Sequence, residues 1–384
     1  MRTWFASLGF AVVACANAGP AREAAVRSDS SGIEVVTSSP TDQALAWEFQ
    51  PVLTLGGANE GPEAFFNVPG TGVAFGSAGQ VVVLDAGNKR VHLFSESGGA
   101  IRSFTRGGGG PGELQFPSSL FIDSVGSIAV HDFGHRALLR FDSSGTYLGQ
   151  SAAPSGVFGP IRSDAGAYVF ATRRRDAGTE QYTIRLFRAV GSDTMELVEA
   201  PIPATRSVLY ESCGVSISLP PLFADPPAWD ARGGRIATSG PPDYLVRIFE
   251  DGSEVRNVRR PIPPQPATQE NVLREFGEGE PWTIGNRRCT VPAEELVQQR
   301  GFAELVPTIS KVALAPDGYL WVQREVIGDQ TGPIDIFDDT GEYAGTLPPT
   351  TPWPLAFRSS DRMLALETDE LDVQSVVVYR IVRN

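Results

Sequence analysis

Residues 107–149 read GGGGPGELQFPSSLFIDSVGSIAVHDFGHRALLRFDSSGTYLG, and this stretch decides the fold. It contains four short strand-like runs separated by turns rich in Gly, Ser and Asp. Two features mark it. A turn glycine precedes an apolar run at Gly126, and an aromatic residue ends the next strand at Phe141. Both features recur along the chain, so the stretch is one unit of a repeat.

The repeat has six units. The turn residue stands at Gly79, Gly126, Gly166, Gly234, Gly318 and Asp361, and the aromatic residue at Phe94, Phe141, Phe187, Phe249, Phe337 and Tyr379. The window FDSSGTYLG at Phe141 returns as FDDTGEYAG at Phe337. The first three aromatic residues lie 47 and 46 residues apart, and the last two lie 42 apart. A period in the forties with four strands per unit is typical of a propeller blade. We therefore predict an all-β, six-bladed β-propeller, with a two-sheet sandwich as the alternative.

The two ends of the repeat predict how the ring closes. A further strand follows each of the first five aromatic residues, but only five residues follow Tyr379. The sixth blade therefore lacks its outer strand. The strand-like run Val52–Leu55 precedes the first blade and belongs to no other blade. We predict that it completes blade six and removes the exposed sheet edges, so that the propeller spans residues 51–384.

The connections divide into two faces. The turns within each outer and inner hairpin are short. The connections between the second and third strands, and between blades, are longer and share the opposite face. Variable loops on a rigid β scaffold commonly carry function, so we expect ligands on this loop-rich face. Arg173, Arg174 and Arg175 lie in one such connection and could bind a carboxylate or a phosphate. A solvated loop surface is the alternative interpretation.

One long connection, about residues 265–305, predicts a helical insert between blades four and five. Thr268 can cap a helix over residues 269–276, and Pro292 can begin a second helix that ends at Gly301. Cys289 lies between these helices, and Cys213 lies in the preceding long connection. Cysteines of an exported protein are more often bridged than free, so we expect a Cys213–Cys289 disulfide.

The first residues predict export. Residues 1–18 combine a charged start with an apolar run that is too short to span a membrane, as in a signal peptide. Its end allows two interpretations: lipidation at Cys15, or ordinary cleavage before Gly19. Residues 19–50 are rich in Ala, Ser, Thr and Pro and are typical of a tether. We expect a periplasmic or cell-envelope monomer that contacts the membrane only through a lipid anchor, if it carries one.

Charge and motifs narrow the function. The net charge of −13 argues against nucleic acid, since binding a phosphate backbone requires clustered Lys and Arg. The chain lacks a nucleophile elbow and a helical pair of histidines, so no catalytic residue and no cofactor are predicted. His135 lies at a strand end on the loop-rich face and is a candidate for ligand contact.

Four acidic residues repeat in position. Asp85 and Asp132 end the second strand of blades one and two, where a carboxylate usually caps a loop; ligand contact is the alternative. Glu63 and Glu113 precede the inner strands of the same blades. Carboxylates near the channel mouth could bind Ca²⁺ or another divalent cation, and backbone capping is the alternative.

The first two units resemble NHL repeats. The resemblance rests on a Gly-rich run, a Pro, an apolar strand, Asp-x-x-Gly, a second strand ending in Asp, and a final aromatic, as in residues 107–145 and more weakly 68–98. Blades three to six lack the Gly-rich run and the strand-end Asp. The whole chain resembles exported, largely uncharacterised bacterial six-bladed propellers. The resemblance implies a scaffold for protein, glycan or other ligands, without a fixed reaction.

Two functional hypotheses follow. The first is an extracytoplasmic scaffold that holds a protein, a glycan or a small ligand on its loop-rich face without catalysis. The second is a metal-dependent hydrolase or lyase. Some similar propellers are lactonases or amidating lyases that set carboxylate, Asn or His ligands around the channel, and no such ligand set can be matched in this sequence.

Overall fold

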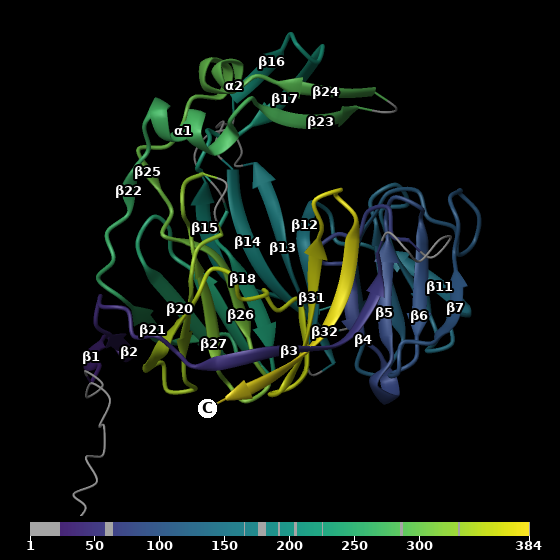
Figure 1. The fold of residues 1–384 in the computed structure, drawn as a ribbon, viewed down its shortest axis with the longest axis horizontal. Helices are drawn as coiled ribbons and strands as arrows, with labels where there is room; N and C mark the ends of the chain where they lie inside the picture. Colours follow the sequence, from purple (N-terminus) through teal and green to yellow (C-terminus); the bar gives the residue numbers. More distant parts are fainter. Residues whose placement is uncertain are drawn as a thin grey trace, which may run out of the picture.

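The computed structural model describes residues 24–57, 64–164, 166–175, 182–190, 193–202, 206–224, 226–284, 287–328 and 331–383. Their strands form the predicted six-bladed β-propeller of four-stranded antiparallel blades (Figure 1). The signal segment 1–18 and Cys15 lie outside the described residues. Neither of the two described α-helices has the length or apolarity of a membrane-spanning helix.

The strands run from the channel outward in each blade. Blade one contains β4 (Val73–Phe75), β5 (Val81–Asp85), β6 (Arg90–Phe94) and β7 (Ala100–Phe104), with a 3₁₀ turn, η2 (Ser77–Gly79), between the first two. Blade two contains β8 (Pro117–Ile122), β9 (Ile128–Asp132), β10 (Ala137–Phe141) and β11 (Tyr147–Ala152). Blade three contains β12 (Val157–Asp164), β13 (Ala167–Arg175), β14 (Tyr182–Val190) and β15 (Asp193–Ile202).

The remaining blades follow the same order. Blade four contains β18 (Trp229–Arg232), β19 (Arg235–Ser239), β20 (Leu245–Glu250) and β21 (Ser253–Arg259). Blade five contains β26 (Ile309–Leu314), β27 (Leu320–Arg324), β28 (Ile334–Phe337) and β29 (Tyr343–Leu347). Blade six contains β30 (Ala356–Ser359), β31 (Arg362–Thr368), β32 (Gln374–Arg383) and, from the N-terminal part of the chain, β3 (Trp47–Gly56).

Ring closure occurs as predicted. Strand β3 pairs antiparallel with β32, from Trp47 opposite Arg383 to Gly56 opposite Ser375. Leu55 on this strand is buried in a cluster that also contains residues of blade one. The two ends of the chain are therefore held in one sheet, and the outer strand of blade six is longer than the predicted Val52–Leu55.

The N-terminal segment corrects one expectation. Within the expected tether, β1 (Val26–Ser30) and β2 (Ile33–Thr37) form a hairpin, and β2 pairs in parallel with β21. Blade four therefore belongs to a six-stranded sheet. The physical reason is that the edge of β21 offers free backbone groups, and the apolar run of β2 buries Val36 against it.

The repeated turn windows share one hydrogen-bond pattern. The Oδ1 of Asp142 accepts from the backbone N–H groups of Ser144 (2.9 Å) and Thr146 (2.8 Å). The Oδ1 of Asp338 accepts in the same way from the residues two and four positions further on, at 2.9 Å each. The recurrence in sequence is therefore a recurrence of turn structure, since the Asp side chain satisfies the turn's own backbone donors.

The core lies between neighbouring blades. All five residues of β5 and of β9 are buried, because these strands are covered on both faces. One cluster joins Val82 and Leu84 of blade one to Val130 and Leu139 of blade two. The runs after the turn glycines thus become central strands, and the inner strands beside them are left to line the channel.

The insert is larger than the two predicted helices. It contains β16 (Arg206–Tyr210), β17 (Val215–Leu219), β22 (Gln265–Pro266), α1 (Gln269–Phe276), β23 (Glu280–Ile284), β24 (Arg287–Val291), α2 (Ala293–Arg300) and β25 (Leu305–Val306). It stands beyond the ends of β13–β15 on the loop-rich face (Figure 1). The Thr268 side chain accepts from the N–H of Asn271, as a helix cap should, and α2 begins one residue after Pro292.

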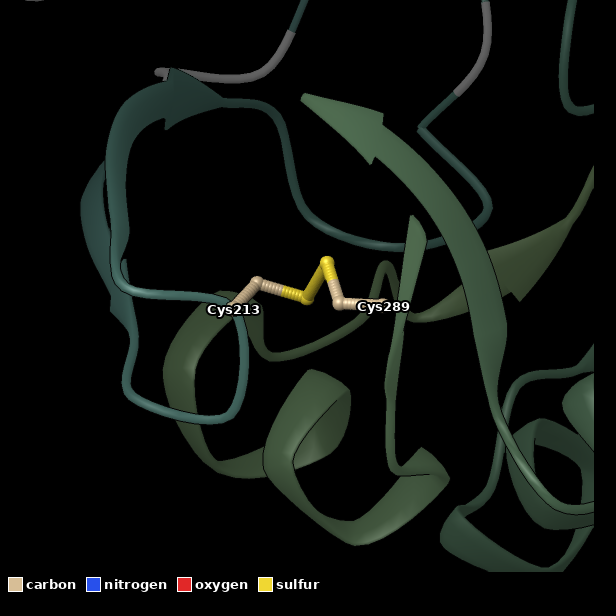
Figure 2. Close-up of a disulfide and its surroundings, with 2 residues drawn as sticks. All are labelled: Cys213 and Cys289. Carbon is tan, nitrogen blue, oxygen red and sulfur yellow. A yellow bond between two sulfur atoms is a disulfide. The ribbon is translucent and has the colours of Figure 1, made fainter. Parts of the chain in front are cut away.

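The predicted disulfide is present. Cys213 lies in the turn between β16 and β17, and Cys289 lies in β24, with 5.6 Å between their Cα atoms (Figure 2). Around it, Val208, Tyr210 and Val272 belong to a small buried cluster of the insert's own residues. The disulfide therefore joins the two long connections on either side of blade four into one module.

Candidate functional site

The inner strands surround the candidate site. Residues of β4, β8, β12, β18, β26 and β30, one strand from each blade, line a central channel with a cavity volume of about 1040 Å³. Small-molecule sites commonly have volumes of roughly 300–1,000 Å³. The channel can therefore hold a small organic ligand. Each inner strand starts at the loop-rich face and ends at the opposite, hairpin face, so the position of a residue along its strand gives its depth.

Aromatic side chains and one lysine lie near the loop-rich end. Trp229 begins β18, and Trp353 precedes β30. Lys311 Nζ lies 5.7 Å from the ring centroid of Trp353, which is within the range of a cation–π contact. Although Lys311 is open to the channel lumen, burial within the ring lowers its pKa, and the charge of Glu325 opposes this effect.

A smaller side pocket adjoins this end. It has a volume of about 230 Å³ and shares Pro226 and Ser310 with the lining of the channel. Glu325 also lines it. The mouth of the channel is therefore widened between blades four and five, beneath the connection that carries the insert.

Two arginines lie near the hairpin end. Arg162 on β12 donates from Nε to Oδ1 of Asp230 at 2.7 Å. The other oxygen of Asp230 accepts from the backbone N–H of Leu314 at 2.8 Å. Arg232, on the same strand as Asp230, donates from Nε to the carbonyl oxygen of Leu314 at 2.9 Å. Both guanidinium groups are thus fixed around one residue of blade five.

The channel carries more positive than negative side chains. Its lining includes Arg162, Arg232 and Lys311, whereas Asp164 and Asp230 are its acidic residues. Both oxygens of Asp164 accept from the backbone N–H of Gly234, at 3.0 and 2.9 Å. Both carboxylates are therefore engaged by protein donors, Arg162 among them, and the lining keeps a surplus of one positive charge.

The strand-end aspartates are loop caps. The carboxylate of Asp85 accepts from the N–H groups of Phe66 (3.0 Å) and Asn67 (3.1 Å) and from Asn88. Asp132 accepts in the same way from the N–H groups of residues 115, 116 and 135, at 2.7, 3.1 and 3.0 Å. Both side chains are fully buried. This geometry is that of a loop cap, the first of the two interpretations, and neither carboxylate is exposed to a ligand.

The structure places Glu113 in a loop. Its Oε2 accepts from the N–H of Gly110 at 2.8 Å, and its Oε1 lies 2.7 Å from Arg106 Nη2. The hydrogen bond from Gly110, followed by that from Arg106, lowers the pKa of Glu113. The carboxylate is held by these two donors, away from the residues that line the channel. Glu63 lies outside the described residues.

The other predicted contact residues are not brought together with the channel. Arg173, Arg174 and Arg175 end strand β13 and do not lie in a loop as expected, and the side chains of the last two lie outside the description. His135 stands in the turn after β9 and donates its backbone N–H to Asp132. Within the described ranges, its Nε2 is buried without a hydrogen-bond partner. Ligand contact by these residues stays a prediction.

Sequence reasoning missed the residues that line the channel. Trp229, Arg232 and Lys311 lie on inner strands that the repeat landmarks do not mark. The available signal is the interruption of apolar runs by charge, as in WDAR at residues 229–232. Such an interruption indicates a side chain that needs a polar partner, but only the assembled ring shows that the strand lines a channel.

Comparison with known proteins supports the fold. A family model described as a 6-bladed beta-propeller (DUF5128) matches residues 74–197, which form blades one to three. A Bacteroides fragilis protein described as exported shares 13% identity over 91% of this chain and 99% of its own, with a TM-score of 0.53. A DUF4221 member from Bacteroides vulgatus shares 9% identity over 89% and 100%, with a TM-score of 0.50.

These likenesses concern the fold alone, because the identities are so low. A gluconolactonase from Xanthomonas campestris shares 11% identity over 88% of this chain and 99% of its own, with a TM-score of 0.39, which is too low to bear on the reaction. No curated protein matches the chain. The six-bladed propeller is thus confirmed, and the finer resemblance to NHL repeats stays a prediction.

Proposed function

We propose that the protein is an extracytoplasmic binding scaffold that takes a small organic ligand into its channel from the loop-rich face, without catalysis. The observation that carries this proposal is the lining of the 1040 Å³ channel, which combines two tryptophans and a lysine at one end with two arginines at the other. Binding sites commonly combine apolar and aromatic walls with a few placed polar groups.

The mouth of the channel favours an aromatic or apolar ligand body. Trp229 and Trp353 supply flat apolar surface, and Lys311 lies close to the ring of Trp353. A ring stacked there would gain dispersion and quadrupole interactions in a site partly withdrawn from water. A protein or glycan partner on the loop-rich face would meet the insert first, since the insert stands beyond the ends of β13–β15 (Figure 1).

The disulfide supports a place outside the cytoplasm. Disulfides persist in oxidising compartments and are rare where thiols are kept reduced. The Cys213–Cys289 bridge therefore agrees with the export signal expected in residues 1–18. Whether the mature chain is anchored by lipid at Cys15 or simply cleaved stays part of the proposal.

The hydrolase alternative finds less support. A catalytic metal needs several convergent protein ligands. Across the part of the chain that the structure describes, no three His, Cys, Asp or Glu side chains gather closely enough to hold a metal ion. The two carboxylates of the channel are also occupied by Arg162 and by backbone N–H groups.

Tryptophan fluorescence tests the proposal. We would titrate small aromatic and aliphatic compounds, neutral and anionic, into the purified protein, and we expect a saturable change from Trp229 and Trp353. The variant W353A should weaken binding. The matched control is W282F, because Trp282 lies in the insert, 5.4 Å from the ring of Tyr210 and away from the channel. Absence of any saturable binding, or equal binding by W353A, would count against the channel; turnover of a lactone by the Ca²⁺-loaded protein would favour the alternative.

A further inference from the structure

The two arginines of the channel form a matched pair. Asp230 and Arg232 are two residues apart on β18, so their side chains leave the same face of this inner strand. Arg162 reaches Asp230 from the neighbouring blade and lies two residues before the end of β12. Arg162 connects through Asp230 to the N–H of Leu314, and Arg232 bonds directly to the carbonyl oxygen of Leu314. The two cations are therefore neighbours at the deep end of the channel.

Each arginine is anchored through Nε alone. Nε of Arg162 bonds to a carboxylate, and Nε of Arg232 bonds to a carbonyl. Among the described residues, the Nη atoms of both side chains have no hydrogen-bond partner, and none of them is a buried atom left unpaired. The outer edges of both guanidinium groups, each with several N–H donors in a plane, are thus free and open to the lumen.

The surroundings of the pair are partly buried and charged. Burial lowers the pKa of Arg232; the charges of Asp230 and Asp164 raise it, and the charge of Arg162 lowers it. The ring centroid of Phe357 lies 5.9 Å from the Arg232 guanidinium, within the range of a cation–π contact. The two cations would repel each other in a partly desolvated cavity, and the carboxylate of Asp230 offsets this repulsion. Asp230 and Asp164 therefore balance the two guanidinium charges, and Lys311 leaves the channel lining with a surplus of one positive charge.

We propose that Arg162 and Arg232 bind the oxyanion group of the ligand, a carboxylate or a phosphate, while the ligand's apolar body lies toward Trp229 and Trp353. This inference rests on the proposed binding function and defines its ligand class as small organic anions. Arginine forks suit both groups, because a carboxylate or a phosphate accepts two parallel N–H bonds from one guanidinium. The ligand therefore enters from the loop-rich face with its anionic group first, and its apolar body stays near the mouth of the channel.

Calorimetric titration of the purified full chain at low ionic strength tests the site, with inorganic phosphate, acetate and benzoate as probes. We expect one saturable site per chain that weakens with added salt. Tighter binding of benzoate than of acetate identifies a carboxylate with an apolar body, and tighter binding of phosphate identifies a phosphoryl group. R232Q should bind roughly tenfold or more weakly, because it removes a charged hydrogen-bond donor. R232K keeps the positive charge but loses the planar guanidinium fork, so its affinity should lie between those of R232Q and the unmodified protein.

The controls separate this inference from the proposed function. R274Q removes an exposed arginine of α1 and should bind like the unmodified protein. Should R232Q fail to fold, R162Q serves as the second variant. Wild-type affinity in a folded R232Q or R162Q would overturn the anion site. Binding of neutral aromatic compounds without saturable binding of any anion would also overturn it and leave the scaffold standing, whereas no binding of either class would contradict both.

Discussion

Arg260 Nη1 lies 2.8 Å from Asp335 Oδ2, and neither side chain is exposed to solvent. Arg260 follows the outer strand of blade four, and Asp335 lies in β28 of blade five, so this pair joins two blades. Tyr244 donates its hydroxyl to Oδ2, and Thr346 donates to Oδ1, each at 2.6 Å. Burial, followed by the charge of Asp335, raises the pKa of Tyr244, which keeps the tyrosine a donor. The carboxylate is thus fully satisfied.

We expect D335A to destabilise the protein by about 3–5 kcal/mol, because a buried guanidinium is left without its main partner. Urea denaturation measures the loss. The matched control is D317A, which removes a partly exposed ion pair with Arg383 and should cost about 1 kcal/mol or less. Equal losses for the two variants would show that the buried pair does not hold blades four and five together.

The capping aspartates predict a repeated effect. D85A and D132A each remove a buried carboxylate and leave part-buried backbone N–H groups of the preceding connection without an acceptor. We expect each variant to lose about 2–4 kcal/mol, since an unsatisfied buried donor costs roughly 1–3 kcal/mol. D142A should lose clearly less, because it opens an exposed turn. Thermal and urea unfolding of the three variants decide the matter, and a loss confined to one blade would contradict equivalent roles.

The parts of the fold set by local chemistry could be predicted from the sequence. A further strand was expected after each of the first five aromatic residues, and Ala100–Phe104 and Tyr343–Leu347 are two of these strands, because Gly and Asp turns fix where they begin. Helix α1 was placed equally well, because Thr268 supplies its own cap. The closing strand was found by counting, since a blade without its outer strand needs a partner.

The parts set by distant pairing could not be predicted. Strand β1 is exposed along its length, and nothing in its sequence shows that β2 pairs with β21 more than 200 residues away, where Arg256 bonds to Glu34. The channel residues are a similar case. Alternation shows that Lys311 avoids the core, but which lumen it enters depends on the tilt of the assembled blades. The inner strands carry neither the turn glycine nor the aromatic residue that mark the repeat, so no landmark identifies them.

The disulfide predicts a redox-dependent stability. Cys213 and Cys289 are 76 residues apart, and the loop they close contains the whole of blade four. In the chain-entropy model, opening such a loop costs at most about 4–5 kcal/mol. We expect the C213S/C289S variant to unfold at a lower urea concentration and to be cleaved first in the insert during limited proteolysis. Both proteins would also carry C15S, so that Cys213 and Cys289 are the only cysteines that differ between them. Unchanged unfolding and unchanged cleavage would show that the packing of Val208, Tyr210 and Val272 alone holds the module.

Two carboxylates fasten the N-terminal segment. The hydrogen bond from Arg256 (2.7 Å) lowers the pKa of Glu34 below its usual 4.5, against the effect of partial burial. Burial alone would raise the pKa of Asp42. The hydrogen bonds and charges of Arg324 and Arg260 outweigh it, so this pKa lies below the usual 3.8. The segment from β1 to Asp42 is thereby tied to blades four and five by charge.

Because both carboxyls have a lower pKa when the segment is docked than when it is free, the free segment takes up protons more readily as pH falls. Their contribution is complete above about pH 4.5 and is lost progressively below it. We expect the β1–β2 hairpin to detach near pH 3 while the central strands stay protected, as hydrogen exchange between about pH 6 and 3 would show after correction for intrinsic rates. E34Q should lower the protection of residues 26–37 already at pH 6 and flatten its pH dependence. A hairpin that stays as protected as β5 at pH 3 would mean that Val36 and the parallel pairing with β21, and not these charges, hold the segment in place.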